Sequence, residues 1–286
     1  QTGVNLNLTI ENRRSGMEYN SLGQITYYQD VMESGAASDL KTTTYFGSRL
    51  NTVGTATEKI DPVYDSVGRL VDYYQHQIEE SKSNTEADTV FLVNTYTHRM
   101  MTEDSSTVTA GDYLAMYDQK SRLVNYTDSI RQTGNNLDIT TTTVRSNMDY
   151  NSLGQITYYQ DIATSSATED LTTTTYFGLN ASGVRVDPVY DSVGRLNEYY
   201  QKTIEVSRRS SDGKYIAILN DGTEGYYANL ADIPADAHLR LDVSTQTYRS
   251  GIDYNSLSQM LAYTDISTQT GVNLNLTIEN RRSGME

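Results

Sequence analysis

This chain contains no cysteine and no tryptophan, and only three prolines and three phenylalanines among 286 residues. The absence of cysteine excludes disulfide bonds and zinc–thiolate sites. Lys and Arg number 22 against 37 Asp and Glu, and the basic residues are scattered, so the chain lacks the basic stripe of a nucleic-acid-binding protein. No apolar run approaches the ~18 residues of a membrane-spanning helix.

Tyrosine is abundant where the other aromatic residues are scarce, with 24 copies. Apolar residues make up only 37 % of the chain, which is little for a compact globule of this length. Tyrosine and threonine favour strands, and a tyrosine ring packs on a half-wet sheet while its hydroxyl reaches a polar partner. The composition therefore predicts a thin β structure with extensive surface.

The last eighteen residues, Gln269–Glu286, repeat Gln1–Glu18 without a change, which defines a period of 268 residues. Shorter repeats lie within it: YNSLGQITYYQD begins at Tyr19 and at Tyr150, and DPVYDSVGRL begins at Asp61 and at Asp187. We predict two diverged half-periods, 1–131 and 132–268, followed by the start of the next period at 269–286. Near-identical tandem units are typical of elongated arrays rather than of single active sites.

Each half-period carries three copies of one motif, which begins with a lead tyrosine and continues into a four-residue turn. Asn20-Ser21-Leu22-Gly23 fits a type I turn that ends in a left-handed residue, because Asn bonds the backbone two residues on and Gly accepts a positive φ. In two copies serine replaces the glycine, at Ser121 and Ser258, and we expect these turns to be strained or altered. The lead tyrosines are Tyr19, Tyr64, Tyr117, Tyr150, Tyr190 and Tyr254.

Two positions recur after each lead tyrosine. An apolar residue follows six places later and a second tyrosine nine places later, so the two side chains face opposite sides of a regular strand. The second tyrosines form either a ligand-stacking ladder or, as we favour, pack against equivalent tyrosines on neighbouring strands. The apolar residues are Ile25, Leu70, Leu123, Ile156, Leu196 and Met260, and the second tyrosines are Tyr28, Tyr73, Tyr126, Tyr159, Tyr199 and Tyr263.

Further turns are expected near 33–39, 132–135, 165–170 and 269–271, with threonine-rich strands between them. Two longer insertions, Ser81–Gly111 and Ser207–Ala237, follow the second motif of each half. The latter is predicted to hold a small hairpin that turns at Asn220–Thr223. The predicted fold is an all-β antiparallel meander of hairpins, a spiralling strip or solenoid-like filament, with no helix longer than about two turns.

The copies Tyr64–Leu70 and Tyr190–Leu196 read Y-D-x-x-G-R-L and resemble the YD repeat of the RHS family. The resemblance implies a long spiralling strip of antiparallel hairpins around a hollow, as in RHS toxins and teneurin-like surface proteins. Family repeats are about twenty residues long, whereas the motif spacings here run from 33 to 64 residues. Asp61-Pro62 and Asp187-Pro188 are interpreted as strand-entry residues, and the self-cleaving Asp dyad of the family cannot be placed.

Few residues indicate chemistry, and we predict no catalytic, cofactor-binding or metal-binding residue. His76, His98 and His238 lie far apart in the sequence and in unrelated contexts. Asn220–Glu224 clusters oxygen ligands suited to calcium, although a plain hairpin turn is the favoured interpretation. Glycosylation sequons begin at Asn7, Asn125 and Asn180, and the threonine runs are candidate O-glycan sites.

The repeats favour a non-enzymatic structural protein, one period of a giant extracellular or cell-surface filament or tube wall. Its expected partners are neighbouring identical periods, and other filaments or cell-surface glycans are further candidates. Neither nucleic acid nor a membrane span is expected. The alternatives are an RHS-type shell around a toxin and a glycan-binding adhesin that uses the two insertions as recognition loops.

Overall fold

The computed structural model describes residues 2–3, 6–7, 10–34, 40–50, 57–82, 89–103, 113–209, 211–271 and 274–283. The all-β prediction is confirmed, because the chain forms an antiparallel meander sheet of hairpin strands. The only helix in the described ranges is a three-residue 3₁₀ turn, η1 (Leu230–Asp232). No helix of this part of the chain has the length and apolarity needed to cross a membrane.

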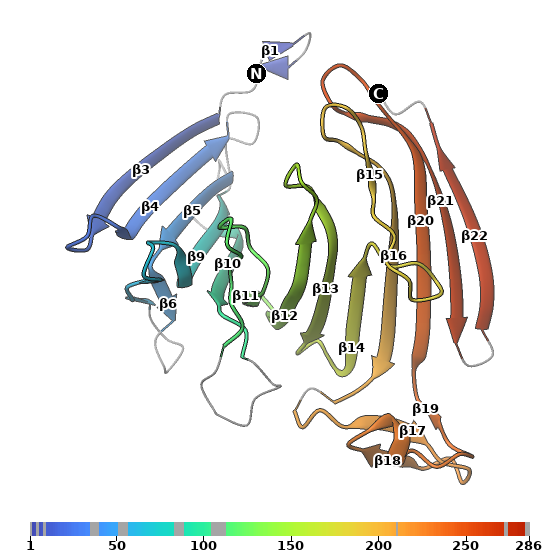
Figure 1. Cartoon of the computed structure of the whole chain (residues 1–286). Helices are drawn as coiled ribbons and strands as arrows, with labels where there is room; N and C mark the ends of the chain where they lie inside the picture. Colours follow the sequence, from blue (N-terminus) through green and yellow to red (C-terminus); the bar gives the residue numbers. More distant parts are fainter. Residues whose placement is uncertain are drawn as a thin grey trace. The chain divides into compact units, whose positions relative to one another are not determined.

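The strands of the main sheet follow the chain with few interruptions (Figure 1). Their order is β22-β21-β20-β16-β14-β13-β12-β11-β10-β9-β5-β4-β3, with β8 on β9 and β15 on β16 as short additions. The first and last strands of this order come from the two copies of the terminal repeat, because β3 lies largely in 1–18 and β22 lies in 269–286. Their bounds are β3 (Ile10–Tyr19), β4 (Ile25–Ser34), β5 (Leu40–Phe46), β8 (Val63–Tyr64), β9 (Leu70–Lys82), β10 (Thr89–Met100), β11 (Tyr126–Gly134), β12 (Leu137–Tyr150), β13 (Ile156–Ser165), β14 (Thr168–Phe177), β15 (Val189–Tyr190), β16 (Leu196–Ser207), β20 (Asp242–Tyr254), β21 (Met260–Gly271) and β22 (Leu274–Arg282).

The chain divides into two compact units. The N-terminal unit comprises Gln1–Ser121 and Tyr126–Thr142, and the C-terminal unit comprises Arg122–Asn125 and Thr143–Glu286. This division by contacts differs from the half-periods 1–131 and 132–268, which are a division by sequence repetition and stay a prediction. Asp61 and Asp187 stand two residues before β8 and β15, the place expected of strand-entry residues.

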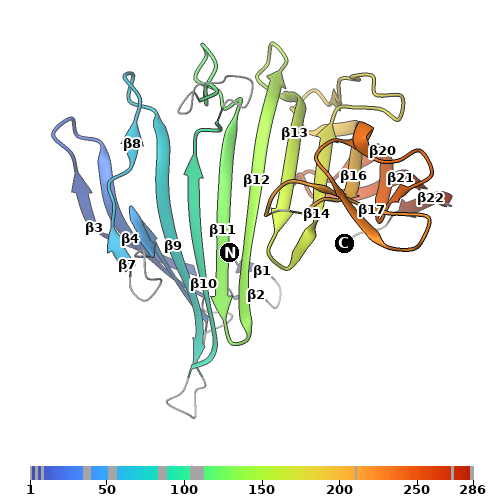
Figure 2. The ribbon, with the colours of Figure 1, turned by 90° about the horizontal axis from the view of Figure 1, so that it is seen from below.

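In the N-terminal unit, β9, β10 and β11 run side by side (Figure 2). The segment Ser81–Gly111, expected as an insertion, contributes β10, a full strand of the main sheet. The predicted turn near 132–135 lies slightly later, at Asn135-Asn136. The turn predicted at 33–39 lies largely outside the described residues. The described residues of this unit also form two short pairs, β1 (Thr2–Gly3) with β2 (Leu6–Asn7), and β6 (Ser48–Leu50) with β7 (Thr57–Lys59).

In the C-terminal unit, two strands of the second insertion and β19, which directly follows it, form a separate three-stranded sheet beyond the ends of β16 and β20 (Figure 1). The predicted hairpin is confirmed: β17 (Tyr215–Ile218) pairs with β18 (Glu224–Tyr227), and β19 (His238–Leu239) pairs with β17. Ser207 at the end of β16 joins this small sheet, since its hydroxyl donates to the carbonyl of Ile216 at 3.0 Å and accepts from the amide of Leu241 at 2.8 Å. The turn between β13 and β14 is at Ser166-Ala167, as predicted.

The predicted motif turn is confirmed. Gly23 N–H donates to the carbonyl of Asn20 at 3.0 Å, and the Asn20 side chain accepts from the amides of Leu22 and Gln24. The serine copies keep this geometry, because Ser121 and Ser258 donate equivalent bonds at 3.0 Å with a φ of 60°. The expected strain is therefore present, since a non-glycine residue stands in the left-handed region, but the turns are not altered.

The sheet is thin, as the composition predicted. Few apolar side chains in the described ranges are fully buried, and several lie beside turns or at the small sheet rather than in one central core. The thinness follows from a meander whose strands contact mainly their sequence neighbours. The buried apolar residues are Phe46, Val71, Met116, Tyr126, Met148, Tyr158, Phe177, Ile216, Ala217 and Ile252.

Candidate functional site

The lead tyrosines connect successive motifs through one repeated hydrogen bond, which we call the tyrosine clasp. In each case the hydroxyl donates to the carbonyl oxygen of the apolar residue that stands six places after the preceding lead tyrosine. Five clasps are present in the part of the chain that the structure describes, and all measure 2.7 Å. They are Tyr64 to Ile25, Tyr117 to Leu70, Tyr150 to Leu123, Tyr190 to Ile156 and Tyr254 to Leu196.

Burial raises the pKa of Tyr64, Tyr117 and Tyr190 above the ordinary value of 10, so these hydroxyls are neutral donors at physiological pH. In four clasps the acceptor carbonyl belongs to the first residue of the strand that leaves the preceding turn, and the fifth acceptor, Leu123, lies three residues before β11. Each clasp therefore fixes one hairpin against the next by side chain to backbone, independently of the strand ladder. A repeated polar tie of this kind holds register along a sheet whose core is thin.

A second recurrent contact lies inside five of the described motif turns. It joins the residue directly after the lead tyrosine, the first position, to the residue five places after the lead tyrosine, the fifth position. Where the first is aspartate the second is arginine, as in Asp191 and Arg195, whose carboxylate and guanidinium lie 2.7 Å apart. Where the first is asparagine the second is glutamine, as in Asn151 and Gln155, with an amide bond of 2.6 Å. The further pairs are Asp65–Arg69, Asn20–Gln24 and Asn255–Gln259.

The side chain at the fifth position also reaches the following motif. Arg195 donates to the carbonyl of Asn255 at 3.4 Å and lies 4.6 Å from the ring centroid of Tyr254. Arg69 does the same to the carbonyl of Asp118 and the ring of Tyr117. The backbone N–H and guanidinium of Arg195 hold the pKa of Asp191 below its ordinary value. Consecutive turns are thus tied at two points, the clasp and this arginine.

The predicted packing of the second tyrosines on equivalent tyrosines was wrong for four of them, because a phenylalanine lies between each pair: Tyr28 and Tyr73 both contact Phe46, and Tyr159 and Tyr199 both contact Phe177. Tyr159 stacks on Phe177 with ring centroids 5.2 Å apart, and the guanidinium of Arg145 lies 4.1 Å from the Tyr159 centroid. Arg145 is also bonded through two nitrogens to Asp161 at 2.7 and 2.6 Å. Copies of this arrangement are Arg14–Asp30 over Tyr28, Arg99–Asp128 over Tyr126 and Arg249–Asp265 over Tyr263.

The opposite face of the N-terminal unit differs from its counterpart in the other half-period. His76 of β9 stacks on Tyr96 of β10 with ring centroids 4.3 Å apart, and His98 of β10 stacks on Tyr74 at 3.8 Å. The positions equivalent to His76 and His98 in the second half are Lys202 and Tyr248. Antiparallel pairing of β9 with β10 places these two histidines on neighbouring strands, although they lie far apart in the sequence.

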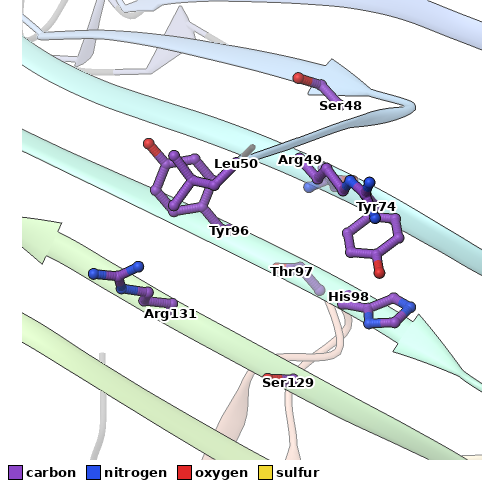
Figure 3. A pocket seen from close by; sticks show the side chains of 10 residues that line it. Ser48, Arg49, Leu50, Tyr74, Tyr96, Thr97, His98, Ser129 and Arg131 are labelled. Carbon is purple, nitrogen blue, oxygen red and sulfur yellow. The ribbon is translucent and has the colours of Figure 1, made fainter. Parts of the chain in front are cut away.

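This aromatic face borders a shallow pocket of ≈ 320 Å³ on the β6, β9, β10 and β11 strands (Figure 3). Tyr74, Tyr96 and His98 supply its rings, and Arg49 and Arg131 supply its positive charge. Arg49 pairs with Glu58 at 2.8 Å, and Arg131 pairs with Asp138 at 2.8 Å. Stacked rings beside guanidinium groups suit a flat polar ligand better than they suit a metal ion.

The Nε2 atoms of both histidines on this face already have hydrogen-bond partners. His76 Nε2 lies 3.0 Å from Asn94 Oδ1, and His98 Nε2 lies 2.9 Å from Asp72 Oδ1. Burial lowers the pKa of His76 below 6.5, partly opposed by the bond to Asn94, so the ring is neutral at pH 7. The described ranges hold no cluster of three or more His, Cys, Asp or Glu that is able to bind a metal.

The remaining candidate residues have local roles. Asn220–Glu224 forms the favoured hairpin turn, in which the Asp221 carboxylate accepts from the Thr223 amide and hydroxyl at 3.0 and 2.6 Å. His238 lies in β19. The side-chain oxygens of Asn125 and Asn180 accept from the amides of Asn147 and Val184, while the side chain of Asn7 is outside the described part.

The comparisons with known proteins found no match: no family model, no curated protein and no solved structure is similar to this chain. The YD-repeat resemblance therefore rests on the motif letters alone. Two signals in the sequence were open to detection but missed. The first signal is that an aspartate at the first position occurs with an arginine at the fifth, and an asparagine with a glutamine. The second is a constant separation of sixteen residues in the pairs Arg14–Asp30, Arg145–Asp161 and Arg249–Asp265.

Proposed function

We propose that the chain is one period of a non-enzymatic, tandem-repeat structural protein whose β-sheet runs on from period to period in an extracellular filament or tube wall. The observation that carries this proposal is the tyrosine clasp, which recurs five times with the same geometry between consecutive motifs. The most regular side chains of the molecule bind their own backbone, as structural side chains do. An extracellular location is supported by the YD-type motif letters.

The terminal repeat supports the same proposal. Thr2 pairs with Asn7 and Gly3 with Leu6 at one end, and the copies Thr270 with Asn275 and Gly271 with Leu274 pair identically at the other. One sequence thus forms one hairpin in two surroundings. A segment that folds the same way at both ends of a period is what a tandem array requires.

The test is the complete coding sequence on both sides of this segment. A filament protein contains many further periods of 268 residues, whereas a toxin shell ends in a short domain without repeats. A coding sequence with one period, or with a terminal non-repeating effector domain, contradicts the filament proposal.

A second candidate, a glycan-binding adhesin, is favoured by the ring-lined pocket of the N-terminal unit. Its site is the strand face with Tyr74 and Tyr96 rather than the two insertions as a whole. A glycan array probed with the chain and with Tyr96→Ala tests it. Binding that the substitution abolishes supports an adhesin, and the equivalent Gln246→Ala on the second half serves as the matched control.

A further inference from the structure

The series of clasps has a sixth position, and it falls between periods. Tyr19 is the lead tyrosine without a preceding motif in this chain, and Met260 is the apolar sixth residue without a following lead tyrosine in the described residues. Tyr19 is 54 % exposed and its hydroxyl contacts only Met17 Sδ, at 3.7 Å, among the contacts described for it. The five other lead tyrosines are half-buried and clasped.

A second group at the same edge is uncovered. Met17 stands two residues before its lead tyrosine and is 42 % exposed, whereas Met148 and Ile252, at the equivalent positions, are 6 % and 5 % exposed. The backbone amide of Met148 donates a hydrogen bond to the carbonyl of Val124 at 3.1 Å. Val124 is the residue directly after the clasp acceptor Leu123. The residue equivalent to Val124 beyond Met260 is Leu261.

The other half of this junction is already visible in the C-terminal unit. β22 is the start of the repeated segment, and it pairs along its length with β21, from Gly271 with Leu274 to Tyr263 with Arg282. Arg282 is the copy of Arg14, which in the N-terminal unit pairs with Asp30 of β4. The same strand therefore binds β4 in one copy and β21 in the other.

We propose that Leu6–Tyr19 is a strand shared by two successive periods, paired with β4 of its own period and with β21 of the preceding one. In this arrangement the Tyr19 hydroxyl donates to the Met260 carbonyl, the Met17 amide donates to the Leu261 carbonyl, and the Met17 side chain is covered. The occupant of the exposed edge is thus a second copy of this chain's own period. The proposal rests on the proposed function, because it names how the array is joined.

A chain of two periods, residues 1–268 followed by 1–286, tests the junction with an internal control. Tyr19→Phe is placed either in the second copy, where a preceding period exists, or in the first, where it does not. Arg13 and Arg14 lie in the shared strand, so tryptic cleavage there in the second copy reports its opening and releases fragments of about one period. Tyr150→Phe, which removes an observed clasp, calibrates the effect.

The expected result is a junction cleavage about fivefold faster for Tyr19→Phe in the second copy, the usual effect of one lost hydrogen bond on a local opening equilibrium. The first-copy variant leaves the rate unchanged. Met17→Asp in the second copy is expected to accelerate junction cleavage more than tenfold, because it places a charge in a covered site. If each substitution gives the same junction cleavage rate in the first copy as in the second, the shared strand is refuted. The number of periods in the coding sequence tests the tandem array independently.

Discussion

At the scale of single residues, the motif is a set of paired choices rather than six independent positions. Aspartate occurs with arginine and asparagine with glutamine, because each pair closes the turn with matched donors and acceptors. A mixed pair retains one acceptor and one donor but loses either the charge or the fork geometry. The identity of the first residue therefore dictates that of the fifth.

Exchanging one pair type for the other tests this coupling. Asp191→Asn and Arg195→Gln are each expected to cost about 0.5–1 kcal/mol of unfolding free energy, a modest value because both side chains are partly exposed. The double variant recreates the pair seen at Asn151 and Gln155 and recovers at least half of the summed loss. Urea denaturation of the four proteins gives the coupling energy, and strictly additive losses refute the pairing.

His76 makes stability depend on pH near neutrality. It faces Tyr45 from β5 and Tyr96 and Asn94 from β10, and burial depresses the pKa of its ring below 6.5. The unfolded chain takes up the proton first, so the contribution is present above pH 6.5 and is lost as the pH falls below it. His76→Gln keeps a bond to Asn94 without this titration. Denaturation at pH 7.5 and 5.5 is expected to show that the variant loses less unfolding free energy between the two pH values than the parent chain does. Equal losses in the two proteins contradict the role of His76.

At the scale of elements, two glycines decide where the chain leaves the sheet. Gly47 and Gly178 follow β5 and β14 with φ of 70° and 74°, and each donates to a neighbouring strand at 2.8 Å, to Tyr74 and Tyr200. A Cβ on Gly178 stands 2.2 Å from the carbonyl oxygen of Thr157, where no side chain fits. Glycine is therefore required where the chain leaves the sheet for two reasons, the positive φ and the close approach of the neighbouring strand's backbone.

Alanine at two matched glycines separates these causes. Gly183 has nearly the same φ, 75°, but open space around its Cβ position. Gly183→Ala is expected to cost about 1–2 kcal/mol for the left-handed backbone alone. Gly178→Ala adds the clash and is expected to cost at least about 3 kcal/mol. Similar midpoints for the two variants in urea contradict the close-approach argument.

The elements also show what the sequence was able to predict. Turn chemistry is local, so the motif turns and the Asn220–Thr223 hairpin were predicted at the residues where they occur. The strand β10 was missed because Ser81–Gly111 carries no motif copy, and only pairing with β9 and β11 identifies it as part of the sheet. The proximity of His76 and His98 was missed for the same reason, since cross-strand register joins residues distant in sequence.

At the scale of the whole molecule, the repeat makes both ends of the strand order the same strand. Within the described ranges, thirteen strands lie on the path of the sheet, and the first and last come from the same repeated segment, so each further period is expected to add twelve. Exposed sheet edges invite pairing with other chains. In a tandem array each such edge meets the strand that completes it, and only the two ends of the whole array remain open.

Removing the duplicate strand is expected to turn the chain into a self-assembling unit. Residues 1–268 keep Leu6–Tyr19 and most of β21, Met260–Thr268, whose outer edge is then open, so the strand of one molecule is expected to pair with β21 of the next in head-to-tail oligomers. A synthetic peptide Gln1–Glu18 in excess is expected to block this growth by occupying β21. Size-exclusion chromatography with light scattering measures it, and a strictly monomeric 1–268 chain argues against the edge.

The central claim is that the sheet passes without a break from one period to the next. The most direct measurement is an experimental structure of the two-period chain. It is expected to place the second copy of Leu6–Tyr19 between β21 of the first period and β4 of the second, with the Tyr19 hydroxyl on the Met260 carbonyl at about the 2.7 Å of the five observed clasps. Two separate sheets, with that strand paired only to its own β4, contradict the account.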